Sequence, residues 1–325
     1  MSRTTTAAPE VKHAGLNGWV EACLFAIALS VLNVTYGIGY QIGAHPVAFL
    51  VYAMPIAALT LLAFTGAGPN WRPIIGHPLS YAVGGGIIAM EAVYYVLLNY
   101  ATPTDGSLLV RLNVPAAALF GVLLGRWPAA LGVVGHVIVV AAIAWYALTI
   151  LPGDRTMSLL LAGGCGLIMS LRAFATEFHP WNRAARTIAE KMQVTGLVLG
   201  VTSLMGTVIV FGLMALVANG TMLQPAWLPQ MRHFLHLPTI ALALFLGTIV
   251  LTAMQYLGFS VVVKIQAQNF VATTALIPLV TLVMQIAAVH IGILAPVPLE
   301  WRVLPAMLAV AGGVLLVIWS ARQRT

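Results

Sequence analysis

Charged side chains are scarce in this chain of 325 residues: 15 are basic, 8 are acidic, and 61% of all residues are hydrophobic. A soluble domain carries charge on roughly a quarter of its residues. The composition therefore excludes a soluble globular protein and predicts an integral membrane protein. In a soluble protein the excess of basic residues would suggest a nucleic-acid partner. Here we expect none, because basic residues at the ends of membrane spans set the orientation of the chain.

Cysteines and catalytic motifs are equally scarce. The two cysteines, Cys23 and Cys165, lie within apolar runs, so no disulfide framework is expected. The chain lacks the phosphate-binding loop of nucleotide-powered motors, the H-E-x-x-H motif and paired C-x-x-C motifs. His233 and His236 are three residues apart, but no cysteine or acidic residue accompanies them, so we predict neither a metal nor a cofactor. An enzyme is accordingly not the expected function.

Apolar runs long enough to cross a bilayer fill the chain instead. A transmembrane helix needs about 20 predominantly apolar residues, and ten runs meet this criterion, separated by turn signals such as His45-Pro46 and Trp127-Pro128. The expected spans are 19–41, 46–65, 78–99, 104–124, 128–150, 157–177, 191–218, 237–258, 267–291 and 301–320. We expect residues 1–18 to form a flexible cytoplasmic N-terminus and residues 321–325 a short cytoplasmic tail.

The basic residues predict the orientation of these spans. With a cytoplasmic N-terminus, ten lysines and arginines fall on the inner side and three, Arg155, Arg232 and Arg302, fall outside. The ten are Arg3, Lys12, Arg72, Arg126, Arg183, Arg186, Lys191, Lys264, Arg322 and Arg324. Such a bias is typical of cytoplasmic loops. We therefore expect a multi-pass protein of the cytoplasmic (inner) membrane with both termini inside.

A weak internal echo divides the chain into two halves. The stretch from Tyr95 to Pro115 and the stretch from Gly258 to Pro278 each read as a helix end, a turn, a polar helix start and a proline within the helix. Five spans per half is an odd number, so the halves must lie in opposite orientations. The expected fold is all-α, with ten transmembrane helices in two inverted five-helix repeats, an arrangement found in many secondary transporters. The repeats are expected over residues 19–151 and 157–320.

These features resemble the EamA-like branch of the drug/metabolite transporter superfamily over nearly the whole chain. The stretches that carry the resemblance are ATPTDGSLLVRLNVPAAALFGVLLGRWP and QAQNFVATTALIPLVTLVM, together with the central glycines Gly135 and Gly312 of the fifth and tenth spans. The chain departs from the family in having Leu124-Gly125-Arg126 where members often have Leu-Gly-Glu, and Tyr52 where members often have arginine. The resemblance implies a ten-helix permease for amino acids, sugars, nucleotides, drugs or other metabolites.

The segment from Glu91 to Pro115 carries charges within the predicted membrane region. Counting at about 1.5 Å per residue places both Glu91 and Arg111 roughly 10 Å below the outer surface. An unpaired charge at this depth costs about 3 kcal/mol or more. We therefore expect Glu91 and Arg111 to form an ion pair, and Asp105 to cap the start of the fourth span.

Further candidate substrate-binding residues lie at helical spacing around this pair. Tyr94, Tyr95 and Asn33 are expected to bind the cargo beside Arg111 and Glu91. Ser107 and Thr274 share polar helix faces with the same region, and their other interpretation is hydrogen bonding between helices. Glu91 and His136 are the candidates for proton coupling. For Glu21 and Arg172 we leave two alternatives open, a mutual pair or side chains that reach the membrane interface.

The predicted function is secondary transport of a small metabolite, such as an amino acid-like solute, a drug or another polar organic solute. Alternating access, with proton-coupled export as one mode, is the expected mechanism. The alternatives are a flippase for lipids or lipid-linked substrates and a membrane-embedded enzyme. The expected partners are a small-molecule substrate and the lipid bilayer, and the protein is expected to be a monomer or a homodimer.

Overall fold

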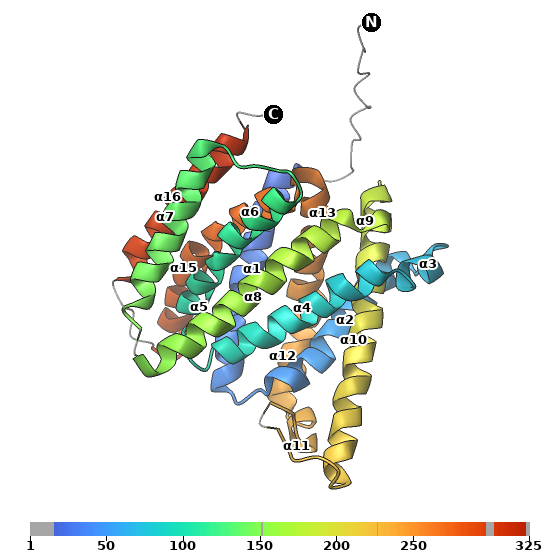
Figure 1. The fold of residues 1–325 in the computed structure, drawn as a ribbon. Coiled ribbons are helices and arrows are strands. Elements are labelled where there is room, and N and C mark those ends of the chain that lie inside the picture. The colour runs from blue at the N-terminus through green and yellow to red at the C-terminus, as the bar shows by residue number, and fades with distance from the viewer. Residues whose placement is uncertain (1–15, 151, 226, 297–301, 323–325) are drawn as a thin grey trace, which may run out of the picture.

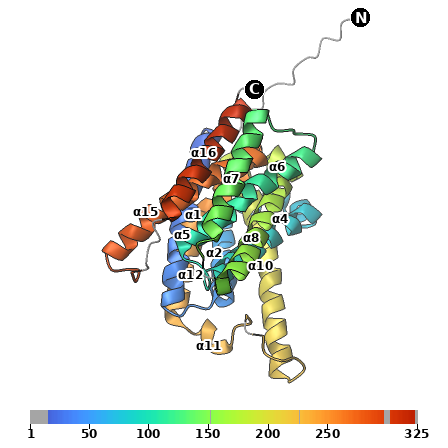
Figure 2. The same ribbon diagram turned by 60° about the vertical axis from the view of Figure 1, so that its left-hand side comes forward.

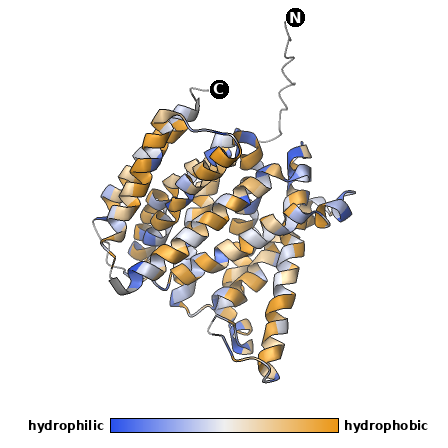
Figure 3. Ribbon diagram, viewed as in Figure 1, coloured by the Kyte–Doolittle hydropathy of each residue, from blue (hydrophilic) through white to orange (hydrophobic). Residues whose placement is uncertain are grey.

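A computed structural model describes residues 16–150, 152–225, 227–296 and 302–322, and the described part contains helices and no strands (Figure 1). Ten helices in it are long and apolar enough to cross a membrane. Apolar residues cover most of the helix surfaces, whereas polar ones gather mainly at helix ends and loops (Figure 3). The protein is therefore a multi-pass membrane protein. Most of the expected N-terminal segment and of the expected C-terminal tail lies outside the described residues.

Most spans begin and end within a few residues of the expected positions. Seven spans are single uninterrupted helices. Five of these are α1 (Gly18–Gln41), α2 (Pro46–Thr65), α4 (Pro78–Leu97), α7 (Ala130–Ala147) and α8 (Pro152–Phe178). Two more are α10 (Ile188–Ala218) and α16 (Val303–Arg322). The remaining three spans are interrupted by a short turn of different helix type. The fourth consists of α5 (Pro103–Leu109), η1 (Val110–Leu112) and α6 (Asn113–Leu123), and the eighth of α12 (Leu237–Phe245), η2 (Leu246–Leu251) and α13 (Thr252–Ile265). The ninth consists of α14 (Ala267–Thr273), η3 (Thr274–Leu276) and α15 (Ile277–His290). Short helices α3 (Trp71–Ile75), α9 (Pro180–Ala184) and α11 (Met231–Phe234) lie in connections.

The eighth span is longer than expected. The sequence prediction ended it at residue 258, but α13 continues to Ile265, and the turn follows at Gln266, whose φ of 68° lies in the left-handed region. Gly258 does not break the helix. It packs against the ring of Phe25, which would lie 3.3 Å from a Cβ built at Gly258. The glycine thus serves close packing of α13 on α1 and not a turn.

Two spans are interrupted for the same reason. Proline has no backbone N–H, so a proline inside a helix leaves the carbonyl four residues earlier without its partner. Pro115 does this to Arg111, and Pro278 does it to Thr274. A tight 3₁₀ turn precedes each proline, η1 in the fourth span and η3 in the ninth. The weak echo in the sequence therefore corresponds to a similar local break in both helices.

Helices α7 and α16 lie side by side, at the left of Figure 1. Their backbones approach at Gly135 and Gly313, where a Cβ on Gly313 would lie 2.7 Å from the carbonyl oxygen of Gly135. Gly313, and not the adjacent Gly312 that the sequence analysis singled out, is the glycine of the tenth span that faces Gly135. Gly312 has no atom near its Cβ position, because its neighbour is the glycine that faces α7.

The packing of the ten spans repeats when the first half (α1 to α7) is exchanged for the second (α8 to α16). Helix α4 packs on α8, and its counterpart α13 packs on α1, the counterpart of α8. In the same way α6 on α8 is matched by α15 on α1, and α4 on α10 is matched by η2 on α2. The pairs α2 with α10 and α7 with α16 join counterparts directly. Figures 1 and 2 show α10 at one edge of the bundle and the α7 and α16 pair away from it.

Candidate functional site

A small cavity of about 20 Å³ lies inside the bundle, where α1, α4, η1 and α8 meet. Its wall combines apolar side chains with a carboxylate, a guanidinium, an amide and a phenol. The lining residues are Leu29, Asn33, Met90, Glu91, Tyr94, Val110, Arg111, Cys165 and Met169. Four of the residues that the sequence marked for binding, Asn33, Glu91, Tyr94 and Arg111, therefore share one cavity.

Glu91 is almost completely buried, with 1% of its surface exposed. Tyr36 of α1 donates a hydrogen bond of 2.8 Å from its hydroxyl to Glu91 Oε2. Glu91 Oε1 has no hydrogen-bond partner among the described residues. A buried carboxylate with an unpartnered oxygen is costly for the fold, so this oxygen is available to accept a proton or a hydrogen bond on the cavity wall. Sequence reasoning missed Tyr36 as its partner.

The expected ion pair between Glu91 and Arg111 is wrong. Arg111 donates from Nε to the carbonyl oxygen of Ser107 at 2.9 Å and from Nη1 to that of Thr274 at 2.6 Å. The second acceptor lies across the boundary between the two halves. Its carbonyl accepts the backbone N–H of Ile277 in the 3₁₀ turn but receives no bond from position 278, because Pro278 has no N–H. Arg111 is drawn to this carbonyl, while Glu91 is held by Tyr36.

The other predicted residues surround the cavity without all lining it. Tyr94 donates to the carbonyl oxygen of Pro103 at 3.2 Å, and the Tyr95 hydroxyl to that of Ala44 at 3.2 Å. The hydroxyls of Ser107 and Thr274 bond carbonyls of their own helices, Thr104 at 2.7 Å and Val271 at 2.6 Å. Tyr95 thus bonds the turn before α2, Ser107 and Thr274 bond within their own spans, and none of the three is part of the lining.

His136 lies apart from this cavity, on α7. It is buried, and neither ring nitrogen has a hydrogen-bond partner among the described residues. It does not line the cavity that holds Glu91. The two residues proposed for proton coupling are therefore at separate places in the fold.

Asp105 does not cap the fourth span as expected. Thr102 is the capping residue, because its hydroxyl accepts a hydrogen bond of 3.1 Å from the backbone N–H of Asp105. The carboxylate of Asp105 instead accepts a hydrogen bond of 2.5 Å from the hydroxyl of Tyr146 in α7.

Two larger cavities open at the opposite ends of the bundle. One of about 400 Å³ is lined by Trp19, Arg126, Lys264 and neighbouring residues, and one of about 370 Å³ by Tyr40, Asp105 and theirs. The three cavities follow one another along helix α1, since Trp19 lines the first, Asn33 the central one and Tyr40 the last. The small central cavity therefore lies between two end cavities.

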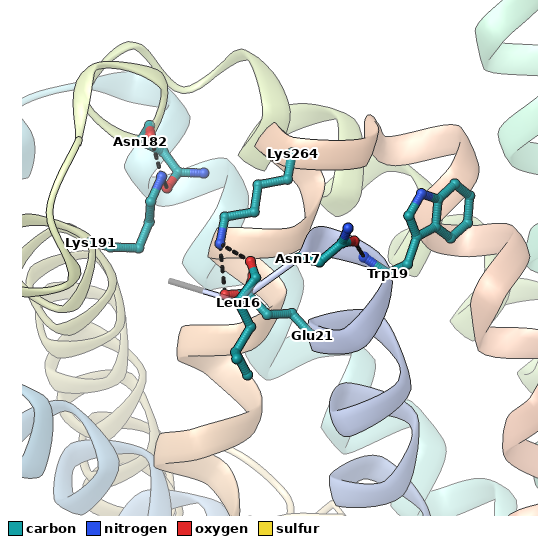
Figure 4. A network of polar contacts seen from close by, with 7 residues as sticks. All are labelled: Leu16, Asn17, Trp19, Glu21, Asn182, Lys191 and Lys264. Carbon is teal, nitrogen blue, oxygen red and sulfur yellow. Dashed lines mark hydrogen bonds and ion pairs between the residues drawn. The ribbon is translucent and has the colours of Figure 1, made fainter. Parts of the chain in front are cut away.

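Ion pairs join the two halves at the Trp19 end. Lys264 of α13 pairs with Glu21 of α1 at 2.7 Å and also donates to the carbonyl oxygen of Leu16 at 3.0 Å (Figure 4). This excludes the alternative in which Glu21 pairs with Arg172. Next to it, Lys191 donates to the carbonyl and side-chain oxygens of Asn182 at 2.5 and 3.0 Å.

A second ion pair lies at the same end. Arg126 pairs with Glu177 at 2.7 Å, and Glu177 also accepts a hydrogen bond of 2.9 Å from the backbone N–H of Ala267 at the start of α14. These are the two ion pairs in the described part of the chain, and each joins the first half to the second.

A histidine corner closes the connection between α8 and α9. His179 is fully buried, lies 2.9 Å from the Ser80 hydroxyl through Nε2, and accepts a hydrogen bond from the backbone N–H of Asn182. Burial lowers the pKa of His179 to about 4, with smaller contributions from His77 and Lys191. The described residues contain no group of three or more metal-ligating side chains that could hold a metal ion.

The architecture is shared with proteins of known structure. No protein-family model matches the chain, and no curated protein matches it. Among 22 matching chains of solved structures, one described only as "Crystal structure of protein" has a TM-score of 0.60 and a sequence identity of 16%. The match covers 94% of this chain and 98% of that one. The likeness therefore establishes the fold.

Proposed function

We propose that this protein is a secondary transporter of a small organic solute. The observation that carries the proposal is the central cavity, where Glu91 keeps an unpartnered oxygen among fully buried side chains. Charged groups within membrane spans are costly and commonly mark solute or proton pathways. Helices interrupted beside the cavity, as at η1 and η3, are typical of substrate sites in transporters.

The proposed mechanism is alternating access by two inverted repeats. Support comes from the packing pattern, which is retained when the two five-span halves are exchanged. In the inverted arrangement the halves rock about the central cavity and expose it first at the Trp19 end and then at the Tyr40 end. The ion pairs Glu21–Lys264 and Arg126–Glu177 would hold the halves together at the Trp19 end while the other end opens.

The proposed setting is the cytoplasmic membrane, with the Trp19 end facing the cytoplasm. Arg126, Lys191 and Lys264 gather near this end, in agreement with the positive bias of cytoplasmic segments. We propose Glu91 as the proton-coupling group in preference to His136, since Glu91 faces the cavity and His136 does not. With the sequence resemblance described above, these features favour an EamA-like permease as our proposal.

Flux into proteoliposomes tests the proposal. We expect purified protein to move at least one radiolabelled solute from a panel of amino acids, carboxylates, nucleosides and cationic drugs, with a rate that depends on an imposed pH gradient. Glu91→Gln should lower this rate about tenfold or more, because it removes the charge and keeps an acceptor for Tyr36. His136→Gln should retain both the rate and the pH dependence.

The same experiment has clear contrary outcomes. Folded protein that moves no solute from any class would contradict transport. Movement of fluorescent phospholipids between leaflets, without solute flux, would favour a flippase. Normal flux in Glu91→Gln together with loss of pH dependence in His136→Gln would show that His136, and not Glu91, is the proton-coupling group.

A further inference from the structure

A second buried arginine, Arg172, lies on α8 about one helical turn from the central cavity. Arg172 of α8 is 6% exposed, and its stem lies against Gly86 of α4, where an added Cβ would be 3.3 Å from the Cβ of Arg172. A guanidinium carries five N–H donors. Arg172 nevertheless makes no side-chain hydrogen bond or ion pair within the described part of the chain, whereas buried donors are normally satisfied.

Gln255 of α13 faces the same place. It is 2% exposed, and its Nε2 has no hydrogen-bond partner among the described residues. Arg172 and Gln255 both line a void of about 10 Å³, walled by apolar side chains that include Ile87, Phe259 and Phe270. The hydroxyl of Thr176, which also lines it, already donates to the Arg172 carbonyl at 2.8 Å. The groups left for a ligand are therefore the amide of Gln255, with its unpartnered N–H donors, and the guanidinium cation of Arg172.

This void and the central cavity are stacked along the same two helices. On α8, Cys165 and Met169 line the central cavity, and Arg172 lines the void. On α4, Glu91 lines the cavity, and Ile87, one turn earlier, lines the void. One helical turn is about 5.4 Å, so a compact solute can reach from one to the other when the halves separate.

The sum of charges in this region favours an anion. Arg111 and Arg172 are two buried cations, and Glu91, which attracts Arg172 electrostatically, is the one buried carboxylate beside them among the described residues. An unbalanced buried charge is costly, and pairing with an opposite charge reduces the cost. A cargo with one negative charge would leave the closed site neutral. Guanidinium also matches the geometry of a carboxylate.

We propose that Arg172 and Gln255 bind the carboxylate of a small monoanionic organic acid when the halves separate and the void joins the central cavity. Its apolar body lies toward Met90, Val110 and Met169 in the central cavity. The purpose of the site rests on the proposed transport function, but its binding chemistry is tested without flux. The two can therefore fail separately.

Thermal unfolding of the purified full-length chain in detergent tests the site with three matched probes. These are 4-methylpentanoate, leucine, which adds an amine to it, and 3-methylbutan-1-amine, which lacks the carboxylate. We expect 4-methylpentanoate at millimolar concentrations to raise the Tm, and the amine to leave it unchanged. The apparent affinity should weaken about tenfold or more in Arg172→Met and in Gln255→Leu. Arg183→Gln, which removes an exposed positive charge, should bind as the wild type does.

The unliganded variants separate binding from a structural role. Arg172→Met should have a Tm equal to or above that of the wild type, because it removes a buried guanidinium that makes no hydrogen bond, whereas Arg126→Met should lower it by breaking the pair with Glu177. The inference is overturned if 4-methylpentanoate has no effect, if it stabilises Arg172→Met equally, if the amine stabilises instead, or if Arg172→Met is as unstable as Arg126→Met. Carboxylate binding without flux would retain this site and reject the transport function.

Discussion

The side chain of Arg111 has two roles, one in the cavity and one in helix structure. It lines the cavity, and it donates a hydrogen bond to the carbonyl of Thr274. That carbonyl lacks the usual bond from four residues later, because Pro278 has no backbone N–H. The bond from Arg111 crosses from the fourth span to the ninth, so the guanidinium also holds the two interrupted helices together. A substitution at this position should therefore affect both the fold and the function, and the two effects can be separated.

Arg111→Ala is expected to lower the free energy of unfolding by about 1–3 kcal/mol, the cost of a buried unsatisfied polar group. The double variant Arg111→Ala/Pro278→Ala should recover much of this loss, because alanine at 278 provides the missing backbone N–H. Solute flux should remain lost in both variants. Thermal unfolding and proteoliposome flux measure the two effects.

The opposite results have distinct meanings. Recovery of flux in the double variant would show that Arg111 acts through helix structure and not on the cargo. Pro278→Ala alone provides the control, and it should fold with Arg111 still in place.

The sequence predicted that Glu91 and Arg111 lie inside the protein, but not which atoms they bind. Their depth follows from counting residues along helices, which is independent of tertiary structure. The partner depends on the 3₁₀ turn at η1, which redirects Arg111, and on Tyr36, which comes from a distant span. Pro278 was a usable signal, because a proline four residues after Thr274 removes one backbone donor from the Thr274 carbonyl.

At the scale of elements, the α8 to α9 corner is a site of pH-dependent stability. His179 is held between Ser80 and the backbone of Asn182, with its pKa lowered to about 4. The ordinary pKa of histidine is about 6.5. Between these values the unfolded chain binds a proton that the folded chain does not, so this contribution to stability is complete above about pH 6.5 and is lost as the pH falls toward 4.

Thermal unfolding of detergent-solubilised protein between pH 7.5 and 4.5 tests this corner. The Tm of the wild type should fall as the pH decreases below about 6.5. His179→Gln should have a smaller fall, and His290→Gln, which changes an exposed histidine, should match the wild type. Equal falls in all three proteins would show that His179 does not titrate as described.

Helix existence was predictable at this scale, and helix ends were less so. Apolar runs bounded by proline and glycine gave the ten spans because a bilayer demands about 20 such residues. The end of the eighth span was misplaced because Gly258 reads locally as a break. Its packing against Phe25, which keeps the helix intact, is a contact between distant residues.

At the scale of the whole molecule, three features support one mechanism. The packing pattern survives exchange of the two halves, the central cavity lies between two end cavities, and ion pairs join the halves near Trp19. The prolines of the fourth and ninth spans were visible in the sequence, and they predict the five-plus-five division that the packing pattern supports. The ion pairs were not, because Glu21, Lys264, Arg126 and Glu177 are brought together only by packing.

Access to Cys165 from the two sides of the membrane tests the central claim most directly. Cys165 lines the central cavity, and Cys23→Ser leaves it as the only thiol in the chain. A membrane-impermeant methanethiosulfonate reagent is added to one side or the other of oriented proteoliposomes, with Cys23→Ser/Cys165→Ser as the unreactive control. Alternating access predicts modification from both sides, slowed by a transported solute. Modification from one side only, in protein that carries out flux, would contradict this mechanism.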